Sequence, residues 1–146
     1  MTILPQPWST RLKKELASYS ASRRDINSQT VEAQSLSKRA IFALQRGNSP
    51  EAEGHLREAH TRLVQLSKTH KAHPSLLREG AYRAALEEYA EAVFFSSCIA
   101  KKPIKPIASL PFDAEVTLAA LCDVTGELYR YAIVCASKKE YEGVQH

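Results

Sequence analysis

Four acidic residues occupy positions where the sequence pattern predicts apolar side chains. One helical pattern has an apolar stripe with alternating spacings of four and three residues, and Glu88 stands within it. Glu91 lies one turn later on the same side. The next helical pattern contains Asp123 and Glu127, one turn apart, in a similar stripe. Charges that face a partly apolar interior are costly, so these carboxylates must be paired with cations, protonated, or bound to a metal ion.

The metal-bound alternative fits a hard divalent cation. Mg²⁺ and Mn²⁺ prefer carboxylate oxygens and water, and acids spaced by three or four residues on facing helices direct several carboxylates at one ion. Such an ion polarises a phosphodiester, helps to deprotonate water and stabilises the leaving oxygen. We therefore predict that Glu88, Glu91 and Asp123 are metal ligands and that Glu127 is a ligand or a general base. A di-iron site is disfavoured because none of the five histidines stands in a Glu-x-x-His motif.

Nearby arginines leave a simpler explanation open. Arg83 or Arg130 could neutralise Glu88 and Glu91 in ordinary ion pairs. The same arginines, together with Arg78, are also our candidates for contacts with the phosphates of a nucleic acid such as RNA, because guanidinium groups bind phosphate well.

The distribution of charge is compatible with such a partner. The net charge is +4, but residues through Ala72 carry 12 Lys and Arg against 6 Asp and Glu, whereas the rest carries 8 against 10. A basic half in a chain with a pI near 9.0 suits a polyanion, although a solvated basic face is an equally good explanation.

Long helices must position these residues. The chain has 146 residues, of which 44% are hydrophobic, enough for one domain over 1–146 with a real core. Only 5 glycines and 7 prolines interrupt it, so we predict an all-α antiparallel bundle of about four long helices. The expected helices run from Trp8 to Gly47, from an N-cap at Ser49 onwards, from Pro74 to about Lys101, and from an N-cap at Asp113 to about Cys135.

The first and last expected helices predict a domain that is incomplete on its own. Ser137-Lys-Lys-Glu140 is typical of a capping box that opens a fifth helix, which the remaining residues supply with only a turn or two. The first helix is too long for a compact chain of this size to cover. We therefore expect a C-terminally shortened domain that buries the first helix by oligomerisation.

Several classes of protein are disfavoured. No apolar run approaches a membrane span, and the first residues lack the basic start and apolar centre of a signal peptide, so we expect a cytoplasmic protein without membrane contact. The three cysteines form no Cys-x-x-Cys pair, which argues against a disulfide framework or a thiolate zinc site.

Two segments around the acids resemble a known family. Leu86-Glu-Glu-Tyr-Ala-Glu-Ala-Val93 and Asp123-Val-Thr-Gly-Glu-Leu-Tyr-Arg-Tyr-Ala-Ile133 are similar to the signature segments of the translin family, in particular to its catalytic type, translin-associated factor X, and to the archaeal homologues. Both segments occur in order and keep all four acids. The resemblance extends more weakly to a Gly-Asn-x-x-Glu-Ala turn after the first helix and to Phe112-Asp-Ala-Glu at the start of the fourth.

The resemblance implies both an activity and an assembly. It implies an all-α subunit of a closed barrel of eight chains, or of a hetero-oligomer with a related subunit, in which a Mg²⁺-dependent endoribonuclease cuts single-stranded or structured RNA. The family continues with further C-terminal helices, so we expect either that this chain is a shortened form or that another polypeptide supplies them. The alternative is a non-catalytic subunit that binds single-stranded nucleic acid or serves as a scaffold. The residues that match the family's catalytic acids are Glu88, Glu91, Asp123 and Glu127.

Overall fold

The computed structural model describes residues 5–71, 73–78 and 80–139. This part of the chain contains helices and connecting segments and no strand, so the predicted all-α fold is confirmed. The predicted fifth helix falls on residues that lie outside the described ranges. The elements are α1 (Gln6–Gln45), α2 (Ser49–Thr69), the short 3₁₀ helix η1 (Leu76–Arg78), α3 (Gly80–Ile99) and α4 (Ala114–Ser137).

The predicted starts of α1, α2 and α4 are close to the observed ones, but the predicted start of the third helix at Pro74 is wrong. The chain turns at residues 74–75 and forms the short η1 before α3 begins at Gly80. Asp113 is the N-cap of α4, as expected, and its side chain accepts a hydrogen bond of 2.9 Å from the backbone N–H of Val116. The start of α2 differs by one residue. Its N-cap is Asn48, whose side-chain oxygen accepts from the backbone N–H of Glu51, and the predicted cap Ser49 is the first helical residue. The amide of Asn48 reaches this N–H because Gly47 turns the chain with a φ of 80°.

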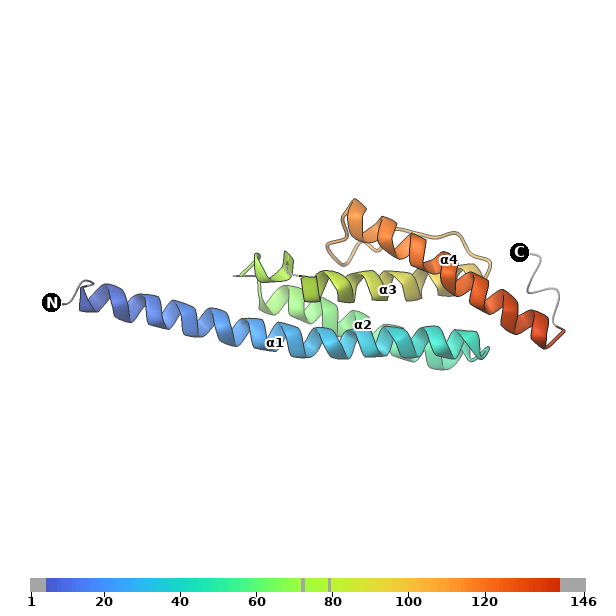
Figure 1. Ribbon diagram of the computed structural model, residues 1–146, viewed down its shortest axis with the longest axis horizontal. Helices are drawn as coiled ribbons and strands as arrows, with labels where there is room; N and C mark the ends of the chain where they lie inside the picture. The colour runs from blue at the N-terminus through green and yellow to red at the C-terminus, as the bar shows by residue number, and fades with distance from the viewer. Residues whose placement is uncertain (1–4, 72, 79, 140–146) are drawn as a thin grey trace.

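The helices form an elongated bundle (Figure 1). α2 runs back along α1, and α3 runs back along α2, in the alternating directions that short connections favour. α4 departs from this order and runs in the same direction as α3. Arg83 near the start of α3 binds Asp113 at the start of α4, and Phe95 near the end of α3 contacts the ring of Tyr131. The cause is the proline-containing linker 100–113, which is long enough to return along α3 before α4 begins.

The core is built from two clusters along this bundle. One joins the middle of α1, the C-terminal half of α2, η1 and the start of α3, and it includes the fully buried Ile26, Leu63 and Tyr82. The other joins the end of α1 to the end of α3 and to α4, and it includes Phe95 and Val124. The acidic residues of α3 and α4 lie on the turns that contribute to the second cluster.

The first half of α1 extends beyond the other helices (Figure 1). Its apolar side chains are therefore uncovered, with Trp8 47%, Leu12 40% and Leu16 66% exposed. Among the described residues, no helix is both long and apolar enough to cross a membrane. The three cysteines are free thiols.

Candidate functional site

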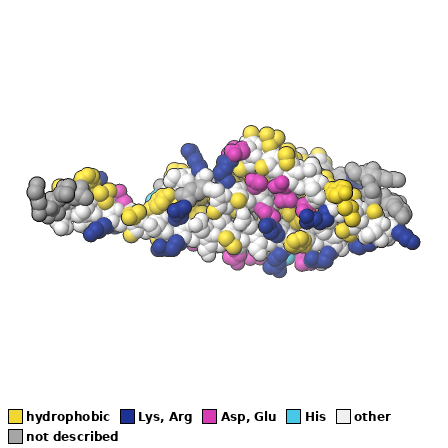
Figure 2. Space-filling view, viewed as in Figure 1, with side chains coloured by type: hydrophobic (Ala, Val, Ile, Leu, Met, Phe, Trp, Pro, Cys, Tyr) yellow, Lys and Arg dark blue, Asp and Glu magenta, His cyan; other side chains and the backbone are white. Residues whose placement is uncertain are grey.

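The fold brings the four predicted acids into one electrostatic group. α3 contributes Glu88 and Glu91, and α4, which runs beside it, contributes Asp123 and Glu127. Figure 2 shows acidic side chains gathered where α3 and α4 meet, with basic side chains close by. The negative charges of the other three acids all raise the pKa of Glu91, which shows that they lie near one another. We call these four residues the acid cluster.

Glu91 is the most deeply placed member of the acid cluster. Its residue is 9% exposed, and it has no hydrogen bond or ion pair with another residue that the structure describes. Burial is the main cause that raises its pKa, and the charges of Glu88 and Asp123 add to it, so that the pKa reaches about 7. A substantial fraction of Glu91 is therefore protonated at neutral pH.

The neighbouring acids are held by side chains of α1 and α4. Lys38 lies 3.7 Å from the carboxylate of Glu88, and its positive charge opposes the increase in the pKa of Glu88 that burial causes. The amide nitrogen of Gln45 donates to the Glu127 carboxylate at 2.9 Å and to the Glu127 backbone carbonyl at 3.0 Å. Arg130 completes the set with an ion pair of 2.9 Å to Glu127. Ion pairing thus accounts for two of the four acids. Arg130 does pair with an acid one turn away, as the sequence suggested, whereas Glu88 pairs with Lys38 and not with Arg83 or Arg130.

Sequence reasoning did not place three residues of this region, Glu87, Lys38 and Gln45, beside the acids, although Lys38 was a candidate to line a path for RNA. Glu87 faces Asp123, and its pKa is raised by burial and then by the charge of Asp123. It follows Arg83 and precedes Glu91 by one turn each, a spacing that could have placed it beside the acids. Lys38 and Gln45 are seven residues apart on α1 and so share one side of that helix, a signal that a search for basic and amide residues at heptad spacing would have found.

The donor chemistry fits a hard divalent ion better than a soft one. Every titratable side chain in the acid cluster is a carboxylate, and Mg²⁺ and Mn²⁺ are the ions that such donors prefer. In this conformation, no three Asp, Glu, His or Cys side chains within the described ranges are close enough to hold one ion. The contacts to Lys38, Gln45 and Arg130 account for the separation of the carboxylates, because they direct Glu88 and Glu127 toward these protein partners.

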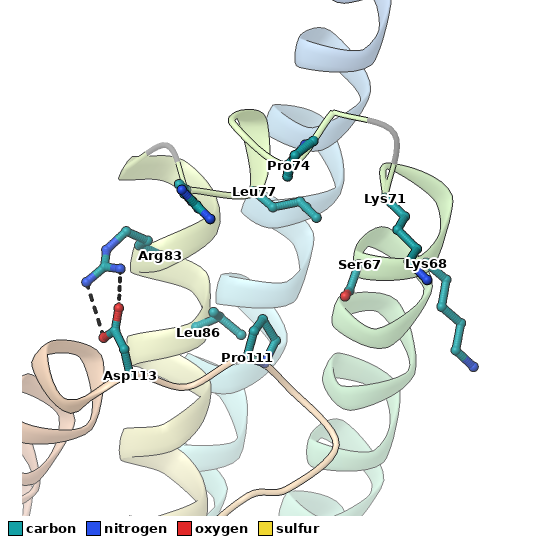
Figure 3. Close-up of a pocket in the computed structure, with 10 residues that line it drawn as sticks. Ser67, Lys68, Lys71, Pro74, Leu77, Arg83, Leu86, Pro111 and Asp113 are labelled. Carbon is teal, nitrogen blue, oxygen red and sulfur yellow. Dashed lines mark hydrogen bonds and ion pairs between the residues drawn. The ribbon is translucent and has the colours of Figure 1, made fainter.

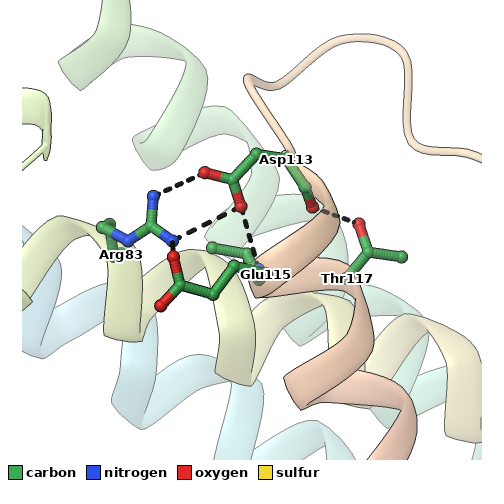
Figure 4. A network of polar contacts seen from close by, with 5 residues as sticks. Arg83, Asp113, Glu115 and Thr117 are labelled. Atoms are coloured by element: carbon green, nitrogen blue, oxygen red, sulfur yellow. Dashed lines mark hydrogen bonds and ion pairs between the residues drawn. The ribbon is translucent and has the colours of Figure 1, made fainter.

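Arg83, a predicted RNA contact, ties the start of α4 to α3. Its guanidinium lies 2.6 Å from Asp113 and 2.7 Å from Glu115 (Figure 4). The ion pair with Arg83 lowers the pKa of the Asp113 carboxyl. Thr117 adds a hydroxyl that donates to the Asp113 backbone carbonyl at 2.7 Å. In this geometry Arg83 positions the helix that carries Asp123.

The other two predicted RNA contacts lie in different places. Arg130 is 60% exposed and adjoins the acid cluster through Glu127. Arg78 lies on η1, before α3, and lines a separate cavity together with Arg83. The fold therefore does not gather the three arginines around the acids, and their contact with RNA stays a prediction.

The whole chain is similar in fold to three solved structures. The crystal structure of apo-NeC3PO matches 98% of this chain and 73% of that chain, with a TM-score of 0.79 and 22% sequence identity. The crystal structure of AfC3PO matches 93% of this chain and 70% of that chain, with a TM-score of 0.84 and 23% identity. A structure of AfC3PO in complex with duplex RNA gives 0.79 and 22% over the same shares.

The similarity to known proteins is weaker in sequence than in structure. No family model and no curated protein matches the chain. The structural similarity extends over nearly all of the sequence, in which the two segments that resemble the translin family stand on α3 and α4. The chain therefore has the translin-like fold that the C3PO structures share.

Proposed function

We propose that this protein is a cytoplasmic, metal-dependent endoribonuclease that cleaves single-stranded or structured RNA at the acid cluster. One observation carries the proposal: Glu91 is buried, forms no ion pair with another described residue and lies near three further carboxylates, whose charges Lys38 opposes only in part. Such an arrangement is unfavourable in the absence of a cation, and sites of catalysis are where proteins retain unfavourable arrangements. The translin-like fold supports the proposal, because AfC3PO, which shares it, binds duplex RNA.

In this proposal the metal would be Mg²⁺ or Mn²⁺, held by Glu88, Glu91 and Asp123, with Glu127 as a further ligand or the general base. When bound, the ion would supply Lewis-acid stabilisation of the phosphodiester and of the leaving oxygen. The residues of α1 would prepare the site. Gln45 orients the Glu127 carboxylate through one hydrogen bond and binds the backbone carbonyl of Glu127 through a second.

Lys38 would have a second role during substrate binding. Its side chain is 58% exposed and its distance to Glu88 is 3.7 Å, so the ammonium is held loosely. It can therefore turn from Glu88 toward a phosphate once Glu88 has another partner. Arg130, which is 60% exposed, can act in the same way from the side of Glu127.

A second candidate function is a non-catalytic subunit that binds single-stranded nucleic acid or serves as a scaffold. The observation that favours it is that Glu88 and Glu127 already have protein partners. Acids satisfied in this way can be purely structural. Cleavage and binding must therefore be measured separately.

The experiment compares RNA cleavage by the purified chain in Mg²⁺ and in EDTA. We expect cleavage of a labelled single-stranded RNA only in Mg²⁺. Glu88→Gln and Asp123→Asn should abolish cleavage while leaving the circular dichroism spectrum and RNA binding in EDTA intact. Glu53→Gln, which changes an acid with a 67% exposed side chain on α2, is the matched control and should leave cleavage unchanged. Binding without cleavage by the parent chain would support the second function.

We also propose that the chain assembles with copies of itself or with a related subunit. The exposed apolar side chains along the first half of α1 are the observation behind this proposal. A helix that extends beyond its own bundle can bury such residues against another chain.

A further inference from the structure

One end of the Gln45 side chain has no partner. Among the described residues, the buried side-chain atoms without a hydrogen bond are Gln45 Oε1, His55 Nε2 and Arg62 Nε. Arg62 already binds two carboxylates through its other nitrogens, and the His55 nitrogen is 3.6 Å from the carboxylate of Glu51. Gln45 Oε1 is different, because it is an acceptor beside a group of acids that cannot donate to it when they are ionised. A buried acceptor of this kind calls for a partner that the protein itself does not supply.

The orientation of the Gln45 amide is set by its neighbours. Its nitrogen Nε2 lies 2.9 Å from the Glu127 carboxylate and 3.0 Å from the Glu127 backbone carbonyl, and both of these groups only accept hydrogen bonds. Exchanging the nitrogen and the oxygen of the amide would place an oxygen against two other oxygens. Oε1 is therefore the atom that is left without a donor.

The unpartnered oxygen lies close to the acid cluster. The two end atoms of an amide are no more than about 2.6 Å apart, so Oε1 is within about 5.5 Å of the Glu127 carboxylate oxygen that Nε2 binds. Two oxygens bound to one Mg²⁺, at about 2.1 Å each, are up to about 4.2 Å apart. A small side-chain rotation thus suffices to bring both to one ion. Lys38, on the same side of α1, contacts Glu88, so this side of α1 meets the acid cluster at two positions.

The chemistry of an amide oxygen suits an ion that four carboxylates already surround. Hard divalent cations accept amide carbonyl oxygens alongside carboxylates. A fifth carboxylate would add to the repulsion among the acids, whereas an amide oxygen adds a ligand without a charge. Glu91 is likewise buried and forms no hydrogen bond or ion pair with another described residue. A bound cation would satisfy both acceptors.

The acids at the start of α4 lack this combination. Asp113 and Glu115 bind Arg83 at 2.6 and 2.7 Å. Figure 3 shows Arg83 and Asp113 joined at the edge of a cavity that both residues line. The protein itself neutralises these acids, so they do not need a metal ion.

We infer that Gln45 Oε1 is a direct ligand of the divalent ion at the acid cluster, so that α1 supplies a neutral donor to a site whose acids come from α3 and α4. The inference rests on the proposed function for the existence of this metal site. It gives the two ends of one amide different roles. The N–H groups of Gln45 hold Glu127, and its oxygen binds the ion.

The experiment counts the water molecules on a bound ion. Tb³⁺, a hard cation that takes the same oxygen donors, is added to the full chain, and its luminescence lifetimes in H₂O and D₂O give the number of coordinated waters. Gln45→Met should weaken Tb³⁺ binding at least about tenfold and add about one water, which takes the place of Oε1. Gln29→Met is the matched control on α1, because the Gln29 amide oxygen accepts from Arg62, and it should change neither quantity. An unchanged water count in Gln45→Met, or an equal gain in Gln29→Met, would overturn the inference.

Gln45→Glu separates the oxygen of the amide from its N–H groups. This variant keeps an oxygen at the position of Oε1 but cannot donate to Glu127. It should therefore retain the water count of the parent chain. If Gln45 acts only by holding Glu127, the Glu variant should gain water as the Met variant does, which contradicts the inference. Circular dichroism of both variants verifies that they are folded.

The outcomes also separate this inference from the proposed function. Asp123→Asn should weaken Tb³⁺ binding, which places the ion at the acid cluster. If it does, and the Gln45 variants coordinate as many waters as the parent, the metal site is retained and Gln45 is not a ligand. Tb³⁺ binding that Asp123→Asn does not affect would refute both. A chain in which Gln45 binds the ion but which does not cleave RNA in Mg²⁺ refutes the nuclease alone.

Discussion

Replacing Glu91 by Gln should stabilise the metal-free protein at alkaline pH and have little effect at acidic pH. Glutamine has nearly the shape of the protonated acid and carries no charge. In the folded protein the pKa of Glu91 is raised from 4.5 to about 7, mainly by burial. The unfolded chain lacks this burial, so its Glu91 ionises near the ordinary value.

The size and the sign of the effect follow from this difference. One pKa unit corresponds to about 1.4 kcal/mol, so the ionised form of Glu91 destabilises the folded state by about 3 kcal/mol. Because the folded pKa is raised, the folded state binds more protons between the two values, and the free energy of unfolding falls as the pH rises from about 4.5 to about 7. The destabilisation is complete above that range and absent below it. Glu91→Gln removes it.

The assay is urea unfolding of the parent chain and of Glu91→Gln in EDTA, at pH 5 and pH 8. We expect the variant to be more stable by up to about 3 kcal/mol at pH 8 and by less than about 1 kcal/mol at pH 5. Glu53→Gln should show no such dependence, since its side chain is exposed. A Glu91→Gln variant that is equally or less stable than the parent at pH 8 would refute the reasoning that Glu91 is a buried acid whose charge is not neutralised by an ion pair.

Two further predictions concern α1. Gln45→Glu places a carboxylate against Glu127 and removes two hydrogen bonds, so it should lower the free energy of unfolding by about 1–3 kcal/mol at pH 8, and Mg²⁺ should restore part of this loss. Gln45→Met is the uncharged control, and equal effects of the two substitutions would contradict the charge argument. Light scattering of the parent chain should show an oligomer, and Leu12→Gln combined with Leu16→Gln should shift it toward a monomer. A parent chain that is already monomeric at micromolar concentration would show that the exposed apolar side chains of α1 do not mediate assembly.

The local features of the site could be predicted from the sequence because they depend on short spacings. The alternating stripes fixed which side of α3 and α4 carries the acids, and Asp113 marked the first turn of α4. Glu88 and Glu91 were therefore expected together, as were Asp123 and Glu127. The all-helical class followed from the same periodicity.

The tertiary contacts of the site could not be predicted in this way. Lys38 and Gln45 reach the acids from α1, and the Gln45–Glu127 contact spans 82 residues of sequence. Periodicity says nothing about which charged residue a distant helix will supply. The same limit applies to Arg83. Its guanidinium group binds Asp113 because the linker brings the start of α4 back to the start of α3. The parallel orientation of α3 and α4 depends on the path of that linker. The prolines predict that the linker is not helical, but they do not determine its path.

The parallel course of α3 and α4 has a consequence for the order of folding. The antiparallel helices α1 and α2 can begin to pair at their short turn, where Arg46 and Glu51 are only five positions apart. The contacts of Arg83 at the starts of the parallel helices α3 and α4 join residues that are 30 and 32 positions apart. Contacts between distant residues carry a larger loop-closure cost and tend to form late. The three preceding helices can therefore associate first, with Glu88 and Glu91 still far from the acids of α4. Electrostatic repulsion among the acids then opposes only the last folding step, the docking of α4. A cation that relieves this repulsion would therefore speed folding, in addition to any role at the acid cluster of the folded protein.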